Sequence, residues 1–204
     1  MRIVLKIGGS LVFSDKIDVE LVKNVSKQIV SLSKNHEFLI VIGGGKIARE
    51  YIGALKLIGK DDTFLDFIGM EVAKLNASLF MGGFEDKAPV EVSNDFKHAL
   101  ATVYLGKIPV LGGTHPGHTT DAVSAMLSEF VSADIFLRFT NVDGVYDKDP
   151  NKYDDAVKYD KVTYSTILSR QLSVIDMAAA VLCDEFSMRS VLFALKEHMN
   201  IVKD

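Results

Sequence analysis

The chain has 204 residues, of which 48% are hydrophobic and 25% charged, close to the average of soluble globular proteins. These proportions argue against disorder, a collagen repeat or a coiled coil as a description of the whole chain. The formal net charge of −4 argues against a broad basic face for nucleic acid, but it leaves room for a local basic pocket that binds a phosphate.

Short apolar runs alternate with longer amphipathic runs, which we interpret as strands and helices. In chain order, we predict a strand at 3–7, a helix at 19–32, a strand at 38–42, helices at 46–57 and 63–80, strands at 88–92 and 108–111, a helix at 118–130, a strand at 135–140, helices at 164–172 and 176–186, a strand at 190–195 and a partial helix at 197–202. Thr63 is the expected N-cap of its helix. The polar stretch 143–161 is interpreted as a solvated loop.

The alternation of fully apolar strands with helices predicts an α/β fold, a three-layer αβα sandwich whose mainly parallel sheet is covered on both faces. We expect residues 1–204 to form one domain, since no linker rich in Pro or Ser divides the chain. The sequence has no uncharged run near the ~18 residues of a membrane helix, and its first residues are too few for a secretory segment, so we expect a cytoplasmic protein. The single cysteine, Cys183, lies in an apolar run and is interpreted as a buried structural thiol.

The glycines gather where predicted strands end. Gly8-Gly9, Gly43-Gly44-Gly45 and Gly112-Gly113 each follow a strand, so all three clusters would lie at the carboxyl edge of a parallel sheet. Glycine lets backbone amides approach a phosphate without a Cβ in the way, and a helix N-terminus adds partial positive charge. One cluster alone is typical of an ordinary turn, but three at one edge indicate phosphate binding. Neither the P-loop nor the dinucleotide fingerprint is present.

Four motifs carry a resemblance to a known family. They are Lys6-Ile7-Gly8-Gly9-Ser10, then Gly43-Gly44-Gly45-Lys46-Ile47-Ala48-Arg49, then Gly112-Gly113-Thr114-His115-Pro116-Gly117-His118-Thr119-Thr120-Asp121, and finally Thr140-Asn141-Val142-Asp143-Gly144-Val145-Tyr146. In this order the chain closely resembles the amino acid kinase family, and within it the archaeal type of uridylate (UMP) kinase. The resemblance covers residues 1 to about 195, and the segment from Thr114 to Asp121 is its most specific part.

The resemblance implies transfer of a phosphoryl group from ATP to UMP, with an acceptor part at roughly 1–130 and an ATP part at roughly 131–204. It implies two catalytic residues, Lys6, which would bridge the moving phosphoryl group, and Asp121, which would organise that lysine. It places ATP on Gly8, Gly9, Ser10, Gly45, Arg49, Thr140, Asn141, Tyr146 and Asp149. It places UMP on Gly44, Asp66, Thr114, His115, Pro116, Gly117, His118, Thr119 and Thr120. Mg²⁺ would accompany ATP on phosphate oxygens and water, without a protein cage.

Several alternatives stay open at the level of single residues. Lys6 could be a lysine that reaches the surface, Arg49 an exposed helix arginine, and Asp66 or Asp121 an acid favoured by a helix N-terminus. His115, His118 and Asp121 could instead form a metal site. The function could be that of a related kinase with another acceptor, such as isopentenyl phosphate, or of a catalytically weak nucleotide-binding sensor or storage protein.

The helix at 63–80 is apolar nearly all round, which predicts burial on several sides. We expect one face on the sheet and another on a partner subunit; the family resemblance implies dimers that assemble into hexamers, as a trimer of dimers. A fully internal core helix is the alternative. Two departures from the family pattern concern Val181, where archaeal relatives often carry a lysine, and the end at Asp204, where relatives usually continue to a further strand.

Overall fold

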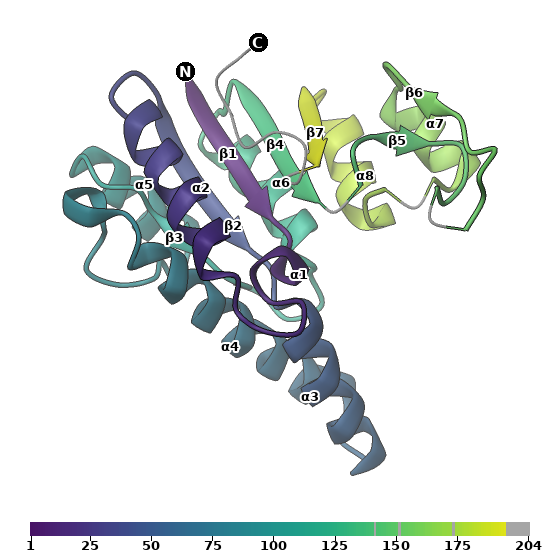
Figure 1. Ribbon diagram of the computed structural model, residues 1–204, viewed down its shortest axis with the longest axis horizontal. Helices are drawn as coiled ribbons and strands as arrows, with labels where there is room; N and C mark the ends of the chain where they lie inside the picture. Colours follow the sequence, from purple (N-terminus) through teal and green to yellow (C-terminus); the bar gives the residue numbers. More distant parts are fainter. Residues whose placement is uncertain (141, 151, 173, 195–204) are drawn as a thin grey trace.

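The computed structural model describes residues 1–140, 142–150, 152–172 and 174–194. Its centre is a five-stranded sheet in the order β3-β2-β1-β4-β7, and every neighbouring pair is parallel (Figure 1). The strands are β1 (Arg2–Ile7), β2 (Glu37–Ile42), β3 (Val110–Leu111), β4 (Ile135–Thr140) and β7 (Ser190–Ala194). Helices cover both faces, so the predicted α/β fold with a parallel sheet is confirmed.

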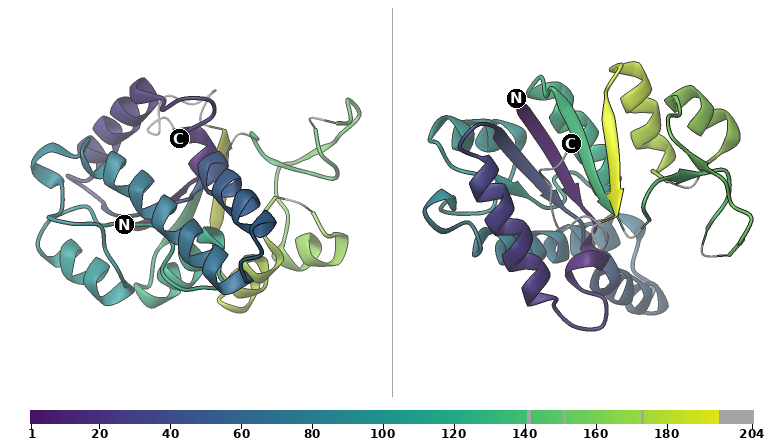
Figure 2. Two further views of the ribbon diagram at one scale, coloured as in Figure 1. Left: turned by 90° about the horizontal axis from the view of Figure 1, so that it is seen from below. Right: turned by 45° about the horizontal axis from the view of Figure 1, so that its top comes forward.

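Alternate residues of β1 face two separate hydrophobic cores. Ile3, Leu5 and Ile7 pack with α2 (Val19–Leu32) and with the last turns of α4 (Asp62–Met81). Val4 faces the other core, which is built from α5 (Phe96–Tyr104), α6 (Thr120–Phe130), α7 (Tyr164–Arg170) and α8 (Met177–Glu185). Figure 2 shows these helix layers from two further directions. A central strand with a core on each side has to be apolar at consecutive positions, which is why it was recognisable in the sequence.

Most predicted elements are present, with small shifts at their ends. The helix predicted at 46–57 is α3 (Gly45–Leu57), and those predicted at 118–130 and 176–186 begin at Thr120 and Met177. The predicted N-cap Thr63 is wrong, because the carboxylate of Asp61 caps α4 by accepting from the Phe64 amide at 2.9 Å. The partial helix predicted at 197–202, and residue 195 of the last strand, lie outside the described residues.

The strand predicted at 88–92 is wrong. Pro89 cannot donate to a ladder, Val90 is fully exposed, and only Ser93 forms an isolated bridge to Leu111. A short 3-10 helix, η1 (Glu85–Lys87), precedes the segment. The helix α5 that follows was not predicted; Asp95 caps it by accepting from the His98 amide at 2.8 Å.

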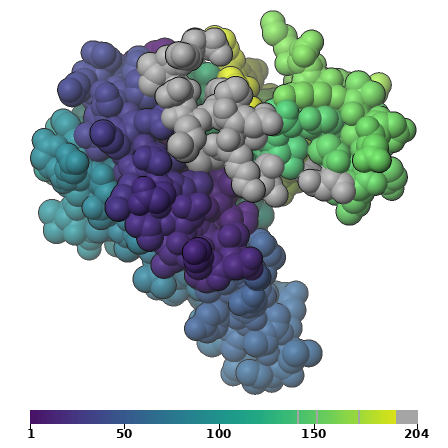
Figure 3. Space-filling model, in the orientation of Figure 1, coloured from purple at the N-terminus to yellow at the C-terminus, as the bar shows by residue number. Residues whose placement is uncertain are grey.

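Three further features lie at the margins of the sheet. The stretch interpreted as a loop contains a small antiparallel hairpin, β5 (Val145–Tyr146) with β6 (Lys158–Tyr159), and a four-residue helix, α1 (Gly9–Val12), follows β1. In Figure 3 the blue segment formed by the end of α3 and the start of α4 stands out from the body of the molecule.

Within the described ranges, no helix has the length and apolar character needed to cross a membrane.

The long helix α4 is buried on one side and exposed on the other. Ala73, Ala77 and Phe80 are buried, whereas Phe67 is 50% exposed and Leu75 is 68% exposed. We expected α4 to be buried on several sides, but within this chain only one side of the helix is buried. Cys183, by contrast, is fully buried on α8 as expected, and burial raises the pKa of its thiol to about 11. Such a thiol stays protonated and is a poor nucleophile.

Candidate active site

Two of the glycine clusters bring their backbones into direct contact. A Cβ added to Gly9 would lie 2.2 Å from the carbonyl oxygen of Gly43 and 2.4 Å from the amide nitrogen of Gly45. Gly45 itself has a φ of +65°, a conformation that side chains rarely adopt. The turn after β1 and the turn after β2 therefore pack together only because both consist of glycine.

The third cluster packs against a helix. A Cβ on Gly112 would lie 2.5 Å from the Lys74 amide nitrogen, and one on Gly113 would lie 2.6 Å from the Met70 side chain, so the turn after β3 rests on α4. From the same helix, the buried amide of Asn76 donates to the carbonyl oxygens of Gly43 at 2.9 Å and Gly44 at 3.3 Å. α4 thus holds two of the glycine turns at once.

One predicted contact of these turns does not hold as expected. The amide of Gly8 donates to the Phe139 carbonyl of β4 at 3.1 Å, so this amide is engaged within the sheet and does not face a ligand. Gly8 is instead the residue before α1, which begins with the buried Gly9 and the exposed Ser10. Gly9 and Ser10, which were predicted to bind ATP together with Gly8, therefore lie in the first turn of the four-residue helix α1.

A cleft of about 220 Å³ opens beside these turns, and we name it the glycine cleft. Its lining combines predicted residues of two separate motifs with Asp66 of α4: Gly44, Gly45, Arg49, Asp66, His115, His118, Thr119 and Thr120. Arg49 is exposed on α3, and its guanidinium makes no hydrogen bond or ion pair within the described part of the chain. A planar cation at the margin of a cleft lined by glycine is suited to a phosphate.

The segment 114–118 forms one wall of the glycine cleft. Asp66 of α4 accepts a hydrogen bond from the Gly117 amide at 2.7 Å, and Gly117 has a φ of +77°. The Thr114 hydroxyl pairs with the His115 ring at 2.9 Å, and the carbonyl of Pro116 lies 3.2 Å from the ring of His118. Thr114, Pro116 and Gly117 thus shape the wall, while the two histidines line the cleft.

Lys6 and Asp121 meet at the carboxyl end of β1. The Lys6 ammonium donates to one carboxylate oxygen of Asp121 at 3.1 Å, and Arg138 of β4 donates through Nε to the other at 3.0 Å. Lys6 and Asp121 are mostly buried, and Arg138 is only 4% exposed. Burial raises the pKa of Asp121, but the charges of Arg138 and Lys6 outweigh burial and hold that pKa below its usual range.

The start of α6 is tied to the start of α8. Thr119 caps α6 by accepting from the Ala122 amide at 3.1 Å, and its hydroxyl donates to Asp176. Asp176 in turn caps α8 by accepting from the Ala179 amide at 3.0 Å. Two helix N-termini therefore share one hydrogen-bond chain, which positions Asp121 in the first turn of α6.

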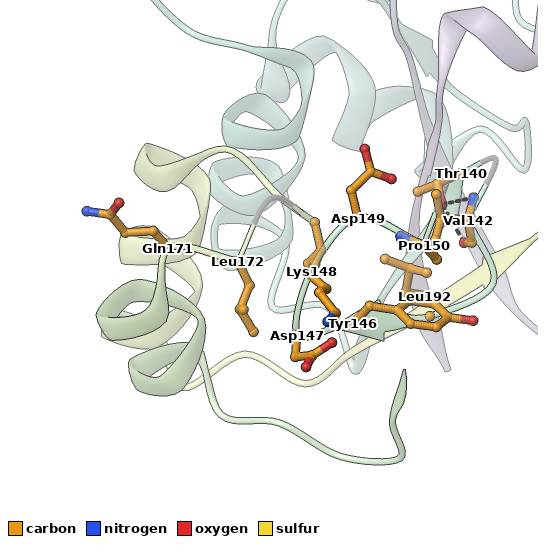
Figure 4. Close-up of a pocket in the computed structure, with 12 residues that line it drawn as sticks. Thr140, Val142, Tyr146, Asp147, Lys148, Asp149, Pro150, Gln171, Leu172 and Leu192 are labelled. Carbon is orange, nitrogen blue, oxygen red and sulfur yellow. Dashed lines mark hydrogen bonds between the residues drawn. The ribbon is translucent and has the colours of Figure 1, made fainter. Parts of the chain in front are cut away.

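A second cleft, of about 380 Å³, lies under the β5–β6 hairpin, and we name it the hairpin cleft (Figure 4). Three predicted residues line it, Thr140, Tyr146 and Asp149, whereas Asn141 lies outside the described residues. The Tyr146 hydroxyl and the Lys158 ammonium both donate to Asp143, each at 2.7 Å. These contacts fix the Tyr146 ring and hold the pKa of Asp143 below its usual range.

A third opening, the middle cleft, adjoins the hairpin cleft. It is lined by Asp121 and Asp176, and it shares Gln171, Leu172 and Val174 with the hairpin cleft. Because Thr119 and Thr120 line the glycine cleft and Asp121 lines the middle cleft, the start of α6 lies between these two clefts. In Figure 4 the Gln171 side chain points away from the other labelled residues.

Three residues of this site were not predicted from the sequence. Arg138 carried a visible signal, because it is a charged residue inside the apolar strand at 135–140. Asn76 carried a similar one inside the apolar helix 63–80, and Asp176 stood at a helix start. Among the residues that the structure describes, no group of three or more His, Cys, Asp or Glu side chains is placed to hold a metal ion.

Comparison with known proteins gives consistent matches. The family model described as "Amino acid kinase family" matches residues 1–194. A uridylate kinase of Thermococcus gammatolerans is 47% identical over 163 residues, covering 80% of this chain and 72% of the relative. The crystal structure of uridylate kinase from Archaeoglobus fulgidus matches with a TM-score of 0.87 and 37% identity, covering 98% of this chain and 94% of that one. UMP kinase from Ureaplasma parvum matches with a TM-score of 0.85 and 28% identity, over 99% and 93%.

Proposed function

The chain belongs to the amino acid kinase family, and on that premise we propose that it is a uridylate kinase, which transfers the γ-phosphoryl group of ATP to UMP and releases UDP and ADP. The observation that carries this proposal is the Lys6–Asp121 ion pair at the end of β1, between a cleft lined by glycine and arginine and a cleft lined by an aromatic ring and a carboxylate. Relatives and structural neighbours with the names uridylate kinase and UMP kinase support it.

The two clefts divide the substrates. The glycine cleft would hold UMP, with its phosphate near Gly44 and its ribose hydroxyls near Asp66. Gly45 and Arg49, which the family resemblance places on ATP, line the same cleft and would contact the phosphates of both substrates. The hairpin cleft would hold the ATP nucleoside, with Tyr146 against the base and Asp149 on ribose hydroxyls. In this proposal the acceptor part is roughly 1–130 and the ATP part begins at about 131.

Lys6 supplies the charge that phosphoryl transfer requires. The transferred group carries negative charge on its equatorial oxygens, so catalysis depends on alignment and on a cation at the point of transfer. Lys6 is held at the end of a central strand, with its ammonium oriented by Asp121 at 3.1 Å. No covalent nucleophile is needed, in agreement with the burial of the only cysteine.

We propose that Mg²⁺ arrives with ATP. The donor chemistry fits a cation held by phosphate oxygens and water, because both carboxylate oxygens of Asp121 already accept from cationic side chains. When bound, the ion would neutralise charge on the triphosphate; no residue of this chain is assigned as its ligand.

We also propose a cytoplasmic homo-oligomer, a hexamer built as a trimer of dimers. The exposed apolar side of α4, which includes Phe67 and Leu75, supports a partner there, since large apolar patches on a protein surface commonly mark interaction sites. The proposal is that α4 contributes to the dimer contact.

Acceptor specificity tests the function directly. ADP release is measured with UMP, CMP, acetylglutamate and isopentenyl phosphate at equal concentrations. UMP is expected to give the highest kcat/KM; no rate above background with UMP would refute the proposal. A crystal soaked with UMP and a non-hydrolysable ATP analogue then locates each substrate, and a UMP phosphate away from Gly44, Gly45 and Arg49 would contradict the division of the clefts.

A further inference from the structure

Arg138 is a buried cation that the proposed reaction does not yet use. It lies in the middle of β4 and is 4% exposed, a rare environment for a guanidinium that must keep its charge. Its Nε donates to Asp121 at 3.0 Å, and its Nη2 donates to the Val174 carbonyl at 2.9 Å. Both contacts are long-range, so the side chain joins β4 to α6 and to the segment before α8.

The strand register explains why this cation bears on Lys6. Lys6 of β1 and Arg138 of β4 are register partners on adjacent parallel strands, so both side chains leave the same face of the sheet side by side. Two neighbouring cations repel each other unless an anion lies between them. Asp121 is that anion, with one oxygen on each cation.

The charges of this group have a direct consequence. Lys6 and Asp121 alone would cancel, which leaves little net charge for a phosphoryl group. With Arg138 included, two cations face one anion, and the group keeps a formal net charge of one positive unit. Arg138 also occupies the second oxygen of Asp121, which fixes the carboxylate plane and hence the direction in which Lys6 is held.

We propose that Arg138 is a positioning residue for phosphoryl transfer, which holds the Asp121 carboxylate against Lys6. The inference rests on the proposed kinase function. It deepens that function by assigning a role to a residue that does not line the glycine or hairpin cleft.

An arginine is needed at this position because the side chain donates in two directions. Nε and Nη2 lie on one planar fork and reach a carboxylate and a carbonyl at the same time. A lysine would keep the charge but has a single nitrogen. Arg138→Lys is therefore expected to restore part of the function that Arg138→Met loses.

Other titratable groups surround the Asp121 carboxyl. Lys6 faces it from β1, Arg138 from β4, and Asp176 and Cys183 lie on the α8 side. Only Lys6 and Arg138 donate to it. Loss of Arg138 removes the larger favourable charge, so the pKa of Asp121 should rise and the acid limb of the kcat profile should move to higher pH.

Steady-state kinetics give the first test. Arg138→Met is expected to lower kcat by about 10- to 100-fold, the loss typical of residues that orient a reacting group. The KM for UMP should stay within about twofold, because Arg138 does not line the glycine cleft. The matched control is Arg189→Met, since Arg189 is exposed and its side chain makes no hydrogen bond or ion pair within the described ranges. Arg138→Met with the kcat of the control would overturn the proposal.

A double-mutant cycle separates positioning from direct action. If Arg138 acts through Asp121, then Asp121→Asn and the double variant Asp121→Asn/Arg138→Met should have about the same kcat. Losses that multiply would show that Arg138 acts on the phosphoryl group independently, which would overturn the positioning role. Arg138→Lys should fall between Arg138→Met and the unmodified enzyme.

A readout without turnover distinguishes this proposal from the proposed function. NMR titration of the side-chain carboxyl of Asp121 is expected to show a higher pKa in Arg138→Met, or in Arg138→Lys if the first variant does not fold, than in the unmodified protein. An unchanged pKa would refute the role of Arg138 even in an active kinase. If the unmodified protein releases no ADP in response to UMP, the kinase assignment is refuted. A raised pKa of Asp121 in the Arg138 variant would still support the coupling between Asp121 and Arg138.

Discussion

Replacement of Gly9 by alanine tests the contact between the turn after β1 and the turn after β2. The new Cβ would lie 2.2 Å from the Gly43 carbonyl oxygen and 2.4 Å from the Gly45 amide, far inside the 3.0 Å below which real Cβ contacts essentially never occur. Both neighbours are backbone atoms, so no side-chain rotation relieves the overlap. The two turns would have to separate by about 1 Å.

The expected cost follows from that displacement. Overpacking of this kind destabilises a fold by about 1–3 kcal/mol, and the backbone neighbours place Gly9→Ala at the upper end. For a chain of this size, about 3 kcal/mol lowers Tm by roughly 6–12 °C. The kcat of Gly9→Ala should also fall, by up to about 100-fold, since a displacement of about 1 Å near a reacting group can lower the rate by that factor.

The assay is thermal unfolding combined with UMP-dependent ADP release, and Gly53→Ala is the matched control. Gly53 lies within α3, and a Cβ added there would have no atom within 4 Å, so alanine should stabilise the helix by about 0.5–1 kcal/mol and raise Tm slightly. If Gly9→Ala melts and turns over like the unmodified protein, the close approach of the two glycine turns is refuted. Normal turnover with a lower Tm would limit that approach to a structural role.

The remaining predictions concern the clefts, acid stability and assembly. Lys6→Ala should lower kcat by about 100-fold or more and change the KM for UMP far less, because Lys6 does not line the glycine cleft; an unaltered kcat would remove Lys6 from catalysis. Arg49→Ala should raise the KM for UMP about tenfold with a smaller effect on kcat, as the loss of a phosphate contact requires. The pKa of Asp121 is lower in the folded than in the unfolded protein, which stabilises the fold above the ordinary aspartate pKa of 3.8; this contribution is lost as the pH falls through the folded-state pKa. The free energy of unfolding of Asp121→Asn, measured with urea, should therefore depend less on pH in that range. A pH dependence identical to that of the unmodified protein would contradict the lowered pKa. Phe67→Glu should lower the oligomeric state measured by light scattering, and an unchanged mass would place the partner contact elsewhere.

Local pattern was enough to predict most elements of this fold. β1, β2 and β4 are apolar at consecutive positions because they are buried on both faces, and α2 was predicted with its observed ends because its apolar stripe is regular. In the segment 88–92, Ala88 and Val92 pack against the first core, but Val90 is fully exposed and Pro89 cannot donate to a ladder, so no strand forms there. α5 was missed because its nine residues are too few for a clear periodicity, although Asp95 is a good N-cap.

The candidate site was predicted in parts. Glycines after three strands indicated one edge of a parallel sheet, since carboxyl ends of parallel strands meet there, and the glycine cleft does join residues of two motifs with Asp66 of α4. The amide of Gly8 was assigned to a phosphate because sequence cannot show which backbone donors the sheet already uses. Asn76 and Asp176 were not recognised, because their partners lie 33 and 57 residues away along the chain.

The sequence by itself determined the residue types, the strand-end position of the glycines and the family to which the motifs belong. The family resemblance already implied that Asp121 organises Lys6, 115 residues away, and the tertiary structure alone decided that the contact is an ion pair and that Arg138 completes it. The reason is geometric: strand register sets Lys6 beside Arg138, and the packing of α6 sets Asp121 over both. No local stretch of residues determines the register between distant strands or the position at which a helix packs on a sheet, because both depend on the packing of the whole core.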